Sequence, residues 1–395
     1  MSDFIYVDHA ATTKVRPEVL DAMMPYLTEY YGNVSSMYEF SDITEKAVLD
    51  ARRSIAKSIG AKENEILFTS CGSESDNMAL RGIIKKTGSG HIITTNIEHH
   101  AILHTVQDLE KVGCTATYLE VDDKGLVTPE QLEAAITPET KIISIMMANN
   151  EIGTIEPIKE LAAVAKKHNI PFHTDAVQAV GHLPIDVKDL GVDMLSASGH
   201  KFGAPKGIGF LYVRGGLHVP SLITGGGQER GKRAGTENTA FIVGMAKALE
   251  LAVAEMQQTN ARLIKMRDRL IDGILESIPY CRLNGDRDKR VPGNVNVSIE
   301  FIEGEALLLM LDMNGILASS GSACTTGSLD PSHVLLAIGL THEVAHGSLR
   351  ITLGEDNTEE HIDYILEKLP AIVKRLRDMS PVWEDAVKSG QAKEY

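Results

Sequence analysis

Hydrophobic and polar positions follow two alternating patterns along the first half of the chain. From about residue 17 to residue 215, short apolar runs typical of buried strands are separated by segments with the spacing of amphipathic helices. Three of the runs are Ile66–Thr69, Ile142–Met147 and Ile170–His173, and Ile158–His168 is one of the helical segments. Buried strands joined by helices predict a mainly parallel sheet in an α/β/α layer, whose ligands lie beyond the carboxyl ends of the strands.

The pattern changes after about residue 236. Two long helical segments, Thr236–Met256 and Asn260–Ser277, precede a strand-like run at Asn294–Ile299 and a mixed carboxyl-terminal region. The change predicts a second, smaller α+β domain. We expect the large domain to span residues 14–256, and the small domain to combine residues 1–13 with residues 257–395.

Composition and charge exclude several classes of protein. A chain of 395 residues that is 43% hydrophobic can bury a large core. Its formal net charge of -15 opposes a nucleic-acid or anionic-membrane surface, because such surfaces need clustered Lys and Arg. No stretch is apolar enough to cross a bilayer, and residues 1–6 lack the basic and apolar segments of a secretory signal. We therefore expect a cytoplasmic protein.

An acid and a lysine each follow a strand-like run. The first motif is Asp175-Ala176-Val177-Gln178 and the second is Ser198-Gly199-His200-Lys201. A buried Asp can keep a pyridine nitrogen protonated, and a lysine amine can hold pyridoxal phosphate as a Schiff base. Taken singly, Asp175 could instead cap a turn and Lys201 could be a solvated loop residue. Their order along the chain favours a pyridoxal phosphate enzyme.

Two further motifs lie where the sheet would bind a ligand. Thr69-Ser70-Cys71-Gly72-Ser73-Glu74 follows a strand and opens a helix, so its free N–H groups would suit a phosphate, although Ser73 could simply be a helix cap. Glu98-His99-His100 follows another strand-like run. Adjacent His side chains diverge and no carboxylate–His spacing completes a set of ligands, so we expect no metal site. An imidazole that stacks on a cofactor ring is the better functional interpretation.

Four cysteines are too few and too widely spaced for a disulfide framework. Cys114 and Cys281 are expected to be packed structural thiols. Cys324 differs, because the small residues of the segment 319–328 predict a mobile, accessible loop. By itself this loop is compatible with a nucleophile or with an incidental surface cysteine.

Taken together, the motifs resemble those of group I cysteine desulfurases of the NifS/IscS type. These belong to aminotransferase class V, among the fold-type I pyridoxal phosphate enzymes. The resemblance covers nearly the whole chain and rests on Tyr6–Thr13, Ser73–Asn77, Glu98-His99, Asn149–Gly153, Asp175–Gln178, Ser198–Lys201, Arg233–Asn238, Ser319–Thr325 and Ser348–Arg350. The long loop around Cys324, at about residues 319–330, resembles group I and not the short-loop SufS-type branch. The chain departs from the common pattern at Gly32–Ser36, where Pro usually follows the Asn, and at Thr326-Gly327.

The resemblance implies a role for each candidate residue. Lys201 would carry the cofactor, Asp175 would contact its pyridinium nitrogen, Gln178 its ring hydroxyl, and His99 would stack on the ring. The phosphate would be held by Gly72, Ser73, Ser198 and His200, with Thr236 supplied by the partner subunit of a homodimer. Asn150 and Arg350 would bind the substrate carboxylate, and Cys324 would take the sulfur.

The same resemblance implies conversion of L-cysteine to L-alanine and a persulfide on Cys324. The sulfur would pass to an iron–sulfur scaffold protein or another sulfur acceptor. Two alternatives remain open: a selenocysteine lyase or other class V pyridoxal phosphate aminotransferase or lyase, and a non-enzymatic sulfur-binding or scaffold protein. The acceptor itself also stays open among iron–sulfur assembly, tRNA thiolation and a nitrogenase-related scaffold.

Overall fold

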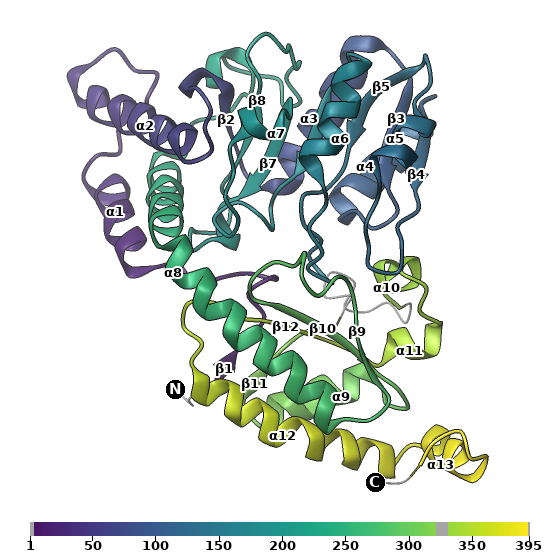
Figure 1. The fold of residues 1–395 in the computed structure, drawn as a ribbon. Helices are drawn as coiled ribbons and strands as arrows, with labels where there is room; N and C mark the ends of the chain where they lie inside the picture. The colour runs from purple at the N-terminus through teal and green to yellow at the C-terminus, as the bar shows by residue number, and fades with distance from the viewer. Residues whose placement is uncertain (1–3, 321–330, 394–395) are drawn as a thin grey trace.

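A seven-stranded sheet forms the centre of the upper body of the molecule (Figure 1). The computed structural model describes residues 4–320 and 331–393. The strands lie in the order β2-β8-β7-β6-β5-β3-β4. Their bounds are β2 (Ile66–Thr69), β3 (His91–Thr95), β4 (Thr115–Leu119), β5 (Thr140–Ser144), β6 (Phe172–Asp175), β7 (Met194–Ser198) and β8 (Gly209–Val213). β8 is antiparallel to both of its neighbours and the other pairs are parallel, which confirms the prediction of a mainly parallel sheet.

Helices cover both faces of this sheet. The helices of the upper body are α1 (Pro17–Thr28), α2 (Glu39–Ser58), α3 (Gly72–Thr87), α4 (His100–Glu110), α5 (Pro129–Ala135), α6 (Ile158–Lys167) and α7 (Val187–Leu190). Neighbouring strand residues point to opposite faces, so Leu67 packs in the same core as α3 and α4, whereas Ile66 and Phe68 pack in the core formed with α2, α5 and α6. The result is the expected α/β/α layer.

A smaller antiparallel sheet lies in the lower body, with strand order β12-β10-β9 (Figure 1). Its strands are β9 (Cys281–Leu283), β10 (Asn294–Ile299) and β12 (Ser348–Thr352). The surrounding helices are α9 (Gly304–Met313), α10 (His333–Ala337), α11 (His342–His346), α12 (Glu359–Asp378) and α13 (Pro381–Lys388). A separate apolar core joins this sheet to α9, α12 and the second half of α8 (Thr239–Ser277).

The amino-terminal segment is part of the lower body although it begins the chain. β1 (Ile5–Tyr6) pairs in parallel with β11 (Ile316–Leu317), and Val7 lies in the core of the lower body. The chain then crosses to the upper body, where the backbone N–H of Thr13 donates to the carbonyl of His200 over 2.9 Å. The segment thus links the two sheets at the edge where the predicted site residues lie.

Three element boundaries differ from the prediction. The two helices expected at residues 236–256 and 260–277 form one 39-residue helix, α8, which the Asn238 side chain caps by accepting from Phe241 N–H. The intervening residues contain no Gly or Pro, so nothing breaks the helix. The strand expected at 142–147 ends at residue 144, and the strand expected at 170–173 starts only after Pro171 and extends to Asp175. Asp175 is therefore the last residue of its strand and does not follow it.

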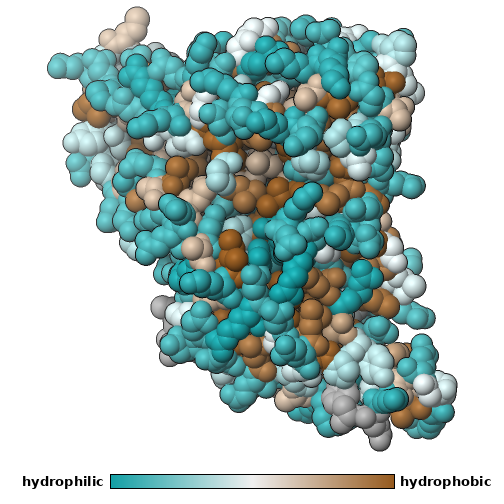
Figure 2. Space-filling view, in the orientation of Figure 1, coloured by the Kyte–Doolittle hydropathy of each residue, from teal (hydrophilic) through white to brown (hydrophobic). Residues whose placement is uncertain are grey.

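Hydrophilic side chains cover most of the visible surface, while hydrophobic residues gather in the middle, where the two bodies meet (Figure 2). Part of this region is an apolar groove along α8, lined by residues such as Val253 and Ile264. Among the helices described, none is long and apolar enough to span a membrane.

Candidate active site

One pocket of about 340 Å³ lies at the carboxyl ends of β6 and β7, beside the first turn of α3. It brings together most of the residues that the sequence singled out: Gly72, Ser73, His99, Asn150, Asp175, Gln178, Ser198, His200, Lys201 and Arg350. Thr236 is exposed and does not line the pocket of its own subunit. Cys324 lies outside the described residues.

Asp175 supplies a buried carboxyl group to the pocket. It is the last residue of β6 and is 5% exposed, and its Oδ1 accepts the backbone N–H of Val177 at 2.9 Å. Burial raises the pKa of Asp175 to about 6, while that hydrogen bond and the nearby charge of Lys201 act in the opposite direction. A positive ring nitrogen beside this carboxyl would favour its ionised form.

The Lys201 amine reaches the pocket from the short 3-10 helix η2 (Gly199–Lys201), directly after β7. Its Nζ donates to the carbonyl oxygens of Ala10 and Ala11, at 2.5 Å and 2.9 Å. The amine is thus held by the amino-terminal segment, within reach of the same space as Asp175.

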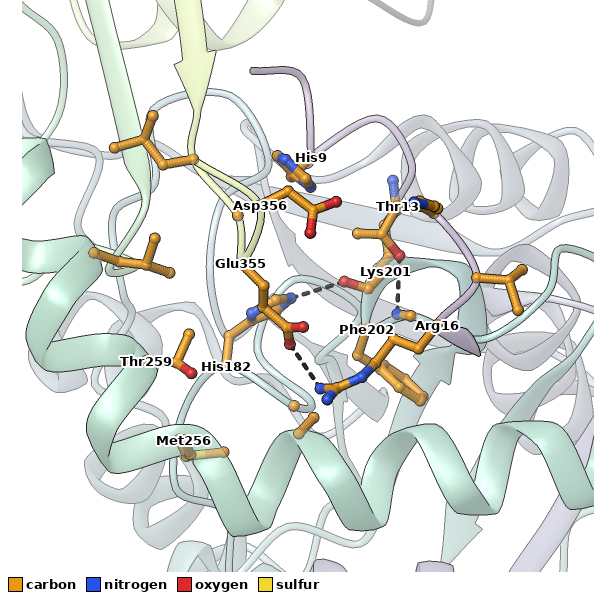
Figure 3. Close-up of a pocket in the computed structure, with 18 of the residues that line it drawn as sticks. His9, Thr13, Arg16, His182, Lys201, Phe202, Met256, Thr259, Glu355 and Asp356 are labelled. Carbon is orange, nitrogen blue, oxygen red and sulfur yellow. Dashed lines mark hydrogen bonds and ion pairs between the residues drawn. The ribbon is translucent and has the colours of Figure 1, made fainter. Parts of the chain in front are cut away.

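A second pocket of about 270 Å³ lies behind the lysine, and Figure 3 looks into it. There His182 lies beside the backbone of Lys201, and its Nε2 is 2.8 Å from the Lys201 carbonyl oxygen. The Thr13 hydroxyl accepts the N–H of Gly203 at 2.9 Å and donates to the carbonyl of His200. These contacts hold the peptide backbone on both sides of Lys201, so the direction of its side chain is set by the surrounding fold.

His99 is the N-cap residue of α4 and lines the same pocket as Asp175. Its Nδ1 accepts the backbone N–H of Ala101 at 3.1 Å, so the proton of the neutral ring resides on Nε2. Burial, with a smaller contribution from the charge of Lys201, lowers the pKa of His99 to about 4. The ring is therefore neutral at pH 7 and is oriented by the helix that it caps.

The amino-terminal end of α3 forms an anion-binding corner. α3 begins at Gly72 and is 16 residues long, so Ser73 lies inside its first turn and the alternative of a helix cap at Ser73 is wrong. The N-cap residue is Cys71, whose side chain makes no capping hydrogen bond. A Cβ at Gly72 would lie 2.6 Å from Cγ2 of Val177, hence only glycine allows this close approach. With Ser198 and His200 beside it, the corner offers N–H groups and hydroxyls to a phosphate.

Arg350 lies in the middle of β12 and is 2% exposed. Its Nη2 donates to Oδ1 of Asp8 at 2.8 Å, and its Nη1 donates to the carbonyl of Asn150 at 3.0 Å. Glu355 and Asp356, the acids close to Arg350 in the sequence, line the second pocket instead. Arg350 is a buried cation that faces the pocket, next to Asn150.

Sequence reasoning assigned no role to three residues that the fold places at the site. Asp8 pairs with Arg350, Asp76 lines the pocket, and Ala10 supplies a carbonyl to both Lys201 and Gln178. Asp8 and Ala10 belong to the motif at residues 6–13, and Asp76 belongs to the motif at residues 73–77. The motifs therefore marked these residues, although they did not indicate what each one does. The expected structural thiols are packed: Cys114 is buried, and burial raises the pKa of Cys281 to about 12.

The donor set fits pyridoxal phosphate. An amine, a buried carboxyl, a flat neutral imidazole and a helix terminus that only glycine allows to pack closely surround one space, which matches a planar ring with a nitrogen, an aldehyde and a phosphate. Within residues 4–320 and 331–393, no three His, Cys, Asp or Glu side chains form a group that could hold a metal ion.

Comparison with known proteins gives the same answer over the whole chain. Residues 5–365 match the family Aminotransferase class-V. The chain is 59% identical to "Cysteine desulfurase IscS" of Clostridium botulinum, over all of both chains, and 55% identical to "Cysteine desulfurase IscS" of Methanosarcina thermophila, over 96% of this chain and 94% of that one. Among solved structures it is similar to a "NIFS-LIKE PROTEIN", with a TM-score of 0.89, 38% identity, and coverage of 95% of this chain and all of the other.

A structure titled "SspA in complex with cysteine" is also similar, with a TM-score of 0.79 and 39% identity over 88% of this chain and 98% of that chain. These matches agree with the layered α/β fold and with the donor set of the pocket. Members of this family depend on pyridoxal phosphate, so pyridoxal phosphate is the cofactor of this protein. The chain belongs to the aminotransferase class-V family.

Proposed function

We propose that the protein is a cysteine desulfurase, which converts L-cysteine to L-alanine and leaves the sulfur on Cys324 as a persulfide. The full-length relatives named as cysteine desulfurases support this activity. The observation that carries the proposal within this chain is the position of Arg350, a buried cation in the same pocket as Lys201 and Asp175. An amine-reactive site with such a cation suits an α-amino acid as substrate.

The residues of the pocket divide into those that would hold the cofactor and those that would hold the substrate. Lys201 would bond to the cofactor, Asp175 would pair with its ring nitrogen, Gln178 would face its hydroxyl, and Gly72, Ser73, Ser198 and His200 would bind its phosphate. When bound, pyridoxal phosphate is an electron sink that lowers the cost of a negative charge at the Cα of an attached amino acid.

Arg350 and Asn150 would orient the substrate by its carboxylate. A guanidinium offers parallel N–H donors to a carboxylate, and Asp8 and the Asn150 carbonyl fix the plane of this guanidinium. With the carboxylate held, Cα faces Lys201, whose amine takes the Cα proton.

Sulfur transfer then needs a thiolate nucleophile. The Cys324 thiolate attacks Sγ of the substrate, the S–S bond forms as the Cβ–Sγ bond breaks, and the electron pair of the broken bond passes into the alanine portion. Neutral His99 is placed to carry protons in this step. L-alanine leaves after its Cβ and Cα have been protonated.

We also propose a homodimer whose subunits share the site. Thr236 is exposed in its own subunit and would bind the phosphate held by the partner. Support comes from large apolar side chains that are exposed over α1, α2 and the connection between them: Leu20, Met24, Leu27, Tyr31, Met37, Tyr38, Phe40 and Ile43. A surface of this kind marks an interaction site.

Three further proposals complete this picture. The separate apolar cores support a large domain at residues 14–256 and a small domain that combines residues 1–13 with 257–395.

The sulfur acceptor would be an iron–sulfur scaffold protein, as the names of the relatives favour, or another sulfur acceptor. We also propose a cytoplasmic location.

Product analysis tests the proposed activity. The purified protein should absorb as a pyridoxal phosphate enzyme and should release one L-alanine for each sulfur transferred from L-cysteine to a thiol. Cys281→Ser is a matched control for Cys324→Ser, because Cys281 belongs to the lower core and not to the pocket. A keto acid as product would contradict the proposal in favour of an aminotransferase, and a strong preference for selenocysteine would favour the lyase.

A further inference from the structure

Three carboxyl groups are buried at or near the cofactor pocket, and Asp76 and Asp175 line it. Asp175 is 5% exposed, Asp76 is 1% exposed and Glu98 is fully buried. They come from β6, from the second turn of α3 and from the segment before α4, so the fold and not a local motif brings them together. The charge of Lys201 acts on Asp175, whereas the surroundings of Asp76 and Glu98 are mainly hydroxyls, backbone amides and the other carboxyls.

His173 is a basic side chain near Asp76, and it is not available as a cation. Its Nε2 is 3.7 Å from Oδ1 of Asp76, but the same Nε2 is 2.9 Å from the Ser196 hydroxyl, and Nδ1 is 2.9 Å from the Ser144 hydroxyl. A neutral imidazole has one N–H and one lone pair, and the two hydroxyls use both. Complete burial lowers the pKa of His173 to about 3, so the ring stays neutral.

The ionised form of Asp76 is therefore unfavourable. Its Oδ1 is buried and has no hydrogen-bond partner among the described residues. A buried carboxylate oxygen without a partner is expensive, and of two carboxyls in one site, one keeps its proton. Burial, and then the neighbouring Asp175, raise the pKa of Asp76 well above its usual value, although a hydrogen bond with the Ser196 side chain acts in the opposite direction.

We propose that Asp76 is a positioning residue that stays a neutral carboxylic acid beside Asp175, so that Asp175 alone of this pair carries a negative charge toward the cofactor. The inference rests on the pyridoxal phosphate site of the proposed function and extends it to a residue with no assigned role. Asp76 lies one turn after Gly72 and Ser73 in α3. A neutral Asp76 lets the helix that binds the phosphate pack against the strand that carries Asp175, without repulsion between two carboxylates.

The first test measures cofactor binding in substituted apoproteins. Asp76→Leu removes the carboxyl group together with its hydrogen bond to the Ser196 side chain, and should weaken the affinity for pyridoxal phosphate by about tenfold, as expected when a buried hydrogen bond is lost. Asp76→Asn keeps the size, the neutral state and an N–H donor, so it should restore most of the affinity and preserve the pH dependence of the absorbance of the bound cofactor. Asp123→Asn, in an exposed turn, is the matched control.

The opposite pattern in Asp76→Asn would overturn the inference. If this variant lost as much affinity as Asp76→Leu, or shifted the pH profile of the bound cofactor, the charge of Asp76 would be required and the residue would be ionised.

Infrared spectroscopy tests the protonation state directly and does not depend on a leucine variant that folds. The spectrum of the wild type minus that of Asp76→Asn should contain the C=O stretch of a protonated carboxyl group, sensitive to D₂O, and the Asp123→Asn difference should contain a carboxylate band instead. A carboxylate band for Asp76 would refute the inference even if L-cysteine is desulfurated normally. Conversely, the protonated band without any desulfurase activity would contradict the proposed function alone.

Discussion

Replacement of Arg350 by lysine tests whether the buried guanidinium selects an amino-acid carboxylate. The wild-type side chain holds Asp8 through Nη2 and the Asn150 carbonyl through Nη1, and its Nε is buried without a partner in the described part of the chain. A lysine keeps the charge but has one nitrogen, so it cannot hold Asp8 and a substrate carboxylate in one plane.

The size of the effect follows from the contacts that are lost. A hydrogen bond to a charged group contributes about 1.5–3 kcal/mol. Loss of one such bond to the substrate carboxylate should therefore lower kcat/KM for L-cysteine by between about tenfold and about 150-fold. The absorbance of the bound cofactor should not change before substrate is added, because Arg350 is not among the residues that would hold the cofactor.

Parallel titrations of L-cysteine and cysteamine provide the assay. Cysteamine has the amine and the thiol but no carboxylate, so its apparent affinity for the holoenzyme, followed by the change in cofactor absorbance, should hardly differ between wild type and Arg350→Lys. Arg282→Lys, on an exposed position of β9, is the control for the loss of a guanidinium. Unchanged L-cysteine kinetics in Arg350→Lys, or an equal loss for both compounds, would refute a role in carboxylate recognition.

Four further predictions concern the cofactor, the sulfur, a buried ion pair and pH. In Lys201→Ala, pyridoxal phosphate should bind through its phosphate contacts while borohydride reduction traps no cofactor on the protein; an adduct on another lysine would contradict the assignment. Cys324→Ser should bind cofactor and L-cysteine but release almost no L-alanine, whereas wild-type turnover would exclude Cys324 as the sulfur acceptor. Glu229→Gln should lower the free energy of unfolding by about 3 kcal/mol, because Glu229 is 5% exposed and its carboxylate accepts hydrogen bonds from both Nη atoms of Arg52, at 2.8 Å and 2.6 Å. The control in urea denaturation is Glu276→Gln at an exposed position, and equal unfolding midpoints for the two variants would contradict this magnitude. The pKa of His99 is about 4 in the folded protein against an ordinary value of 6.5, so the unfolded chain binds more protons between these values and folding stability falls as pH drops from 6.5 toward 4. His99→Asn should therefore lose about 2 kcal/mol less stability than wild type between pH 7 and pH 5, and identical pH dependence in urea denaturation would show that the His99 ring is already protonated or exposed.

Local sequence was sufficient for the layered fold and for most of the candidate site. Strand and helix periods are properties of a few neighbouring residues, so the alternation of short apolar runs and amphipathic segments predicts the layers. Motifs that follow strand ends meet at one edge of a parallel sheet, which explains why residues as distant as Ser73 and Lys201 could be expected in one pocket.

Only the tertiary structure decided which distant side chains become partners. Asp8 and Arg350 are 342 residues apart and meet because the amino-terminal segment pairs with strands of the lower body. Asp76 reads as an ordinary polar helix residue until α3 packs against β6, where it becomes a buried acid. Such contacts depend on how the chain crosses between its two sheets, and no spacing along the sequence records that path. The sequence thus determined which groups are present, whereas the packing of the two bodies determined their burial, their partners and their charge.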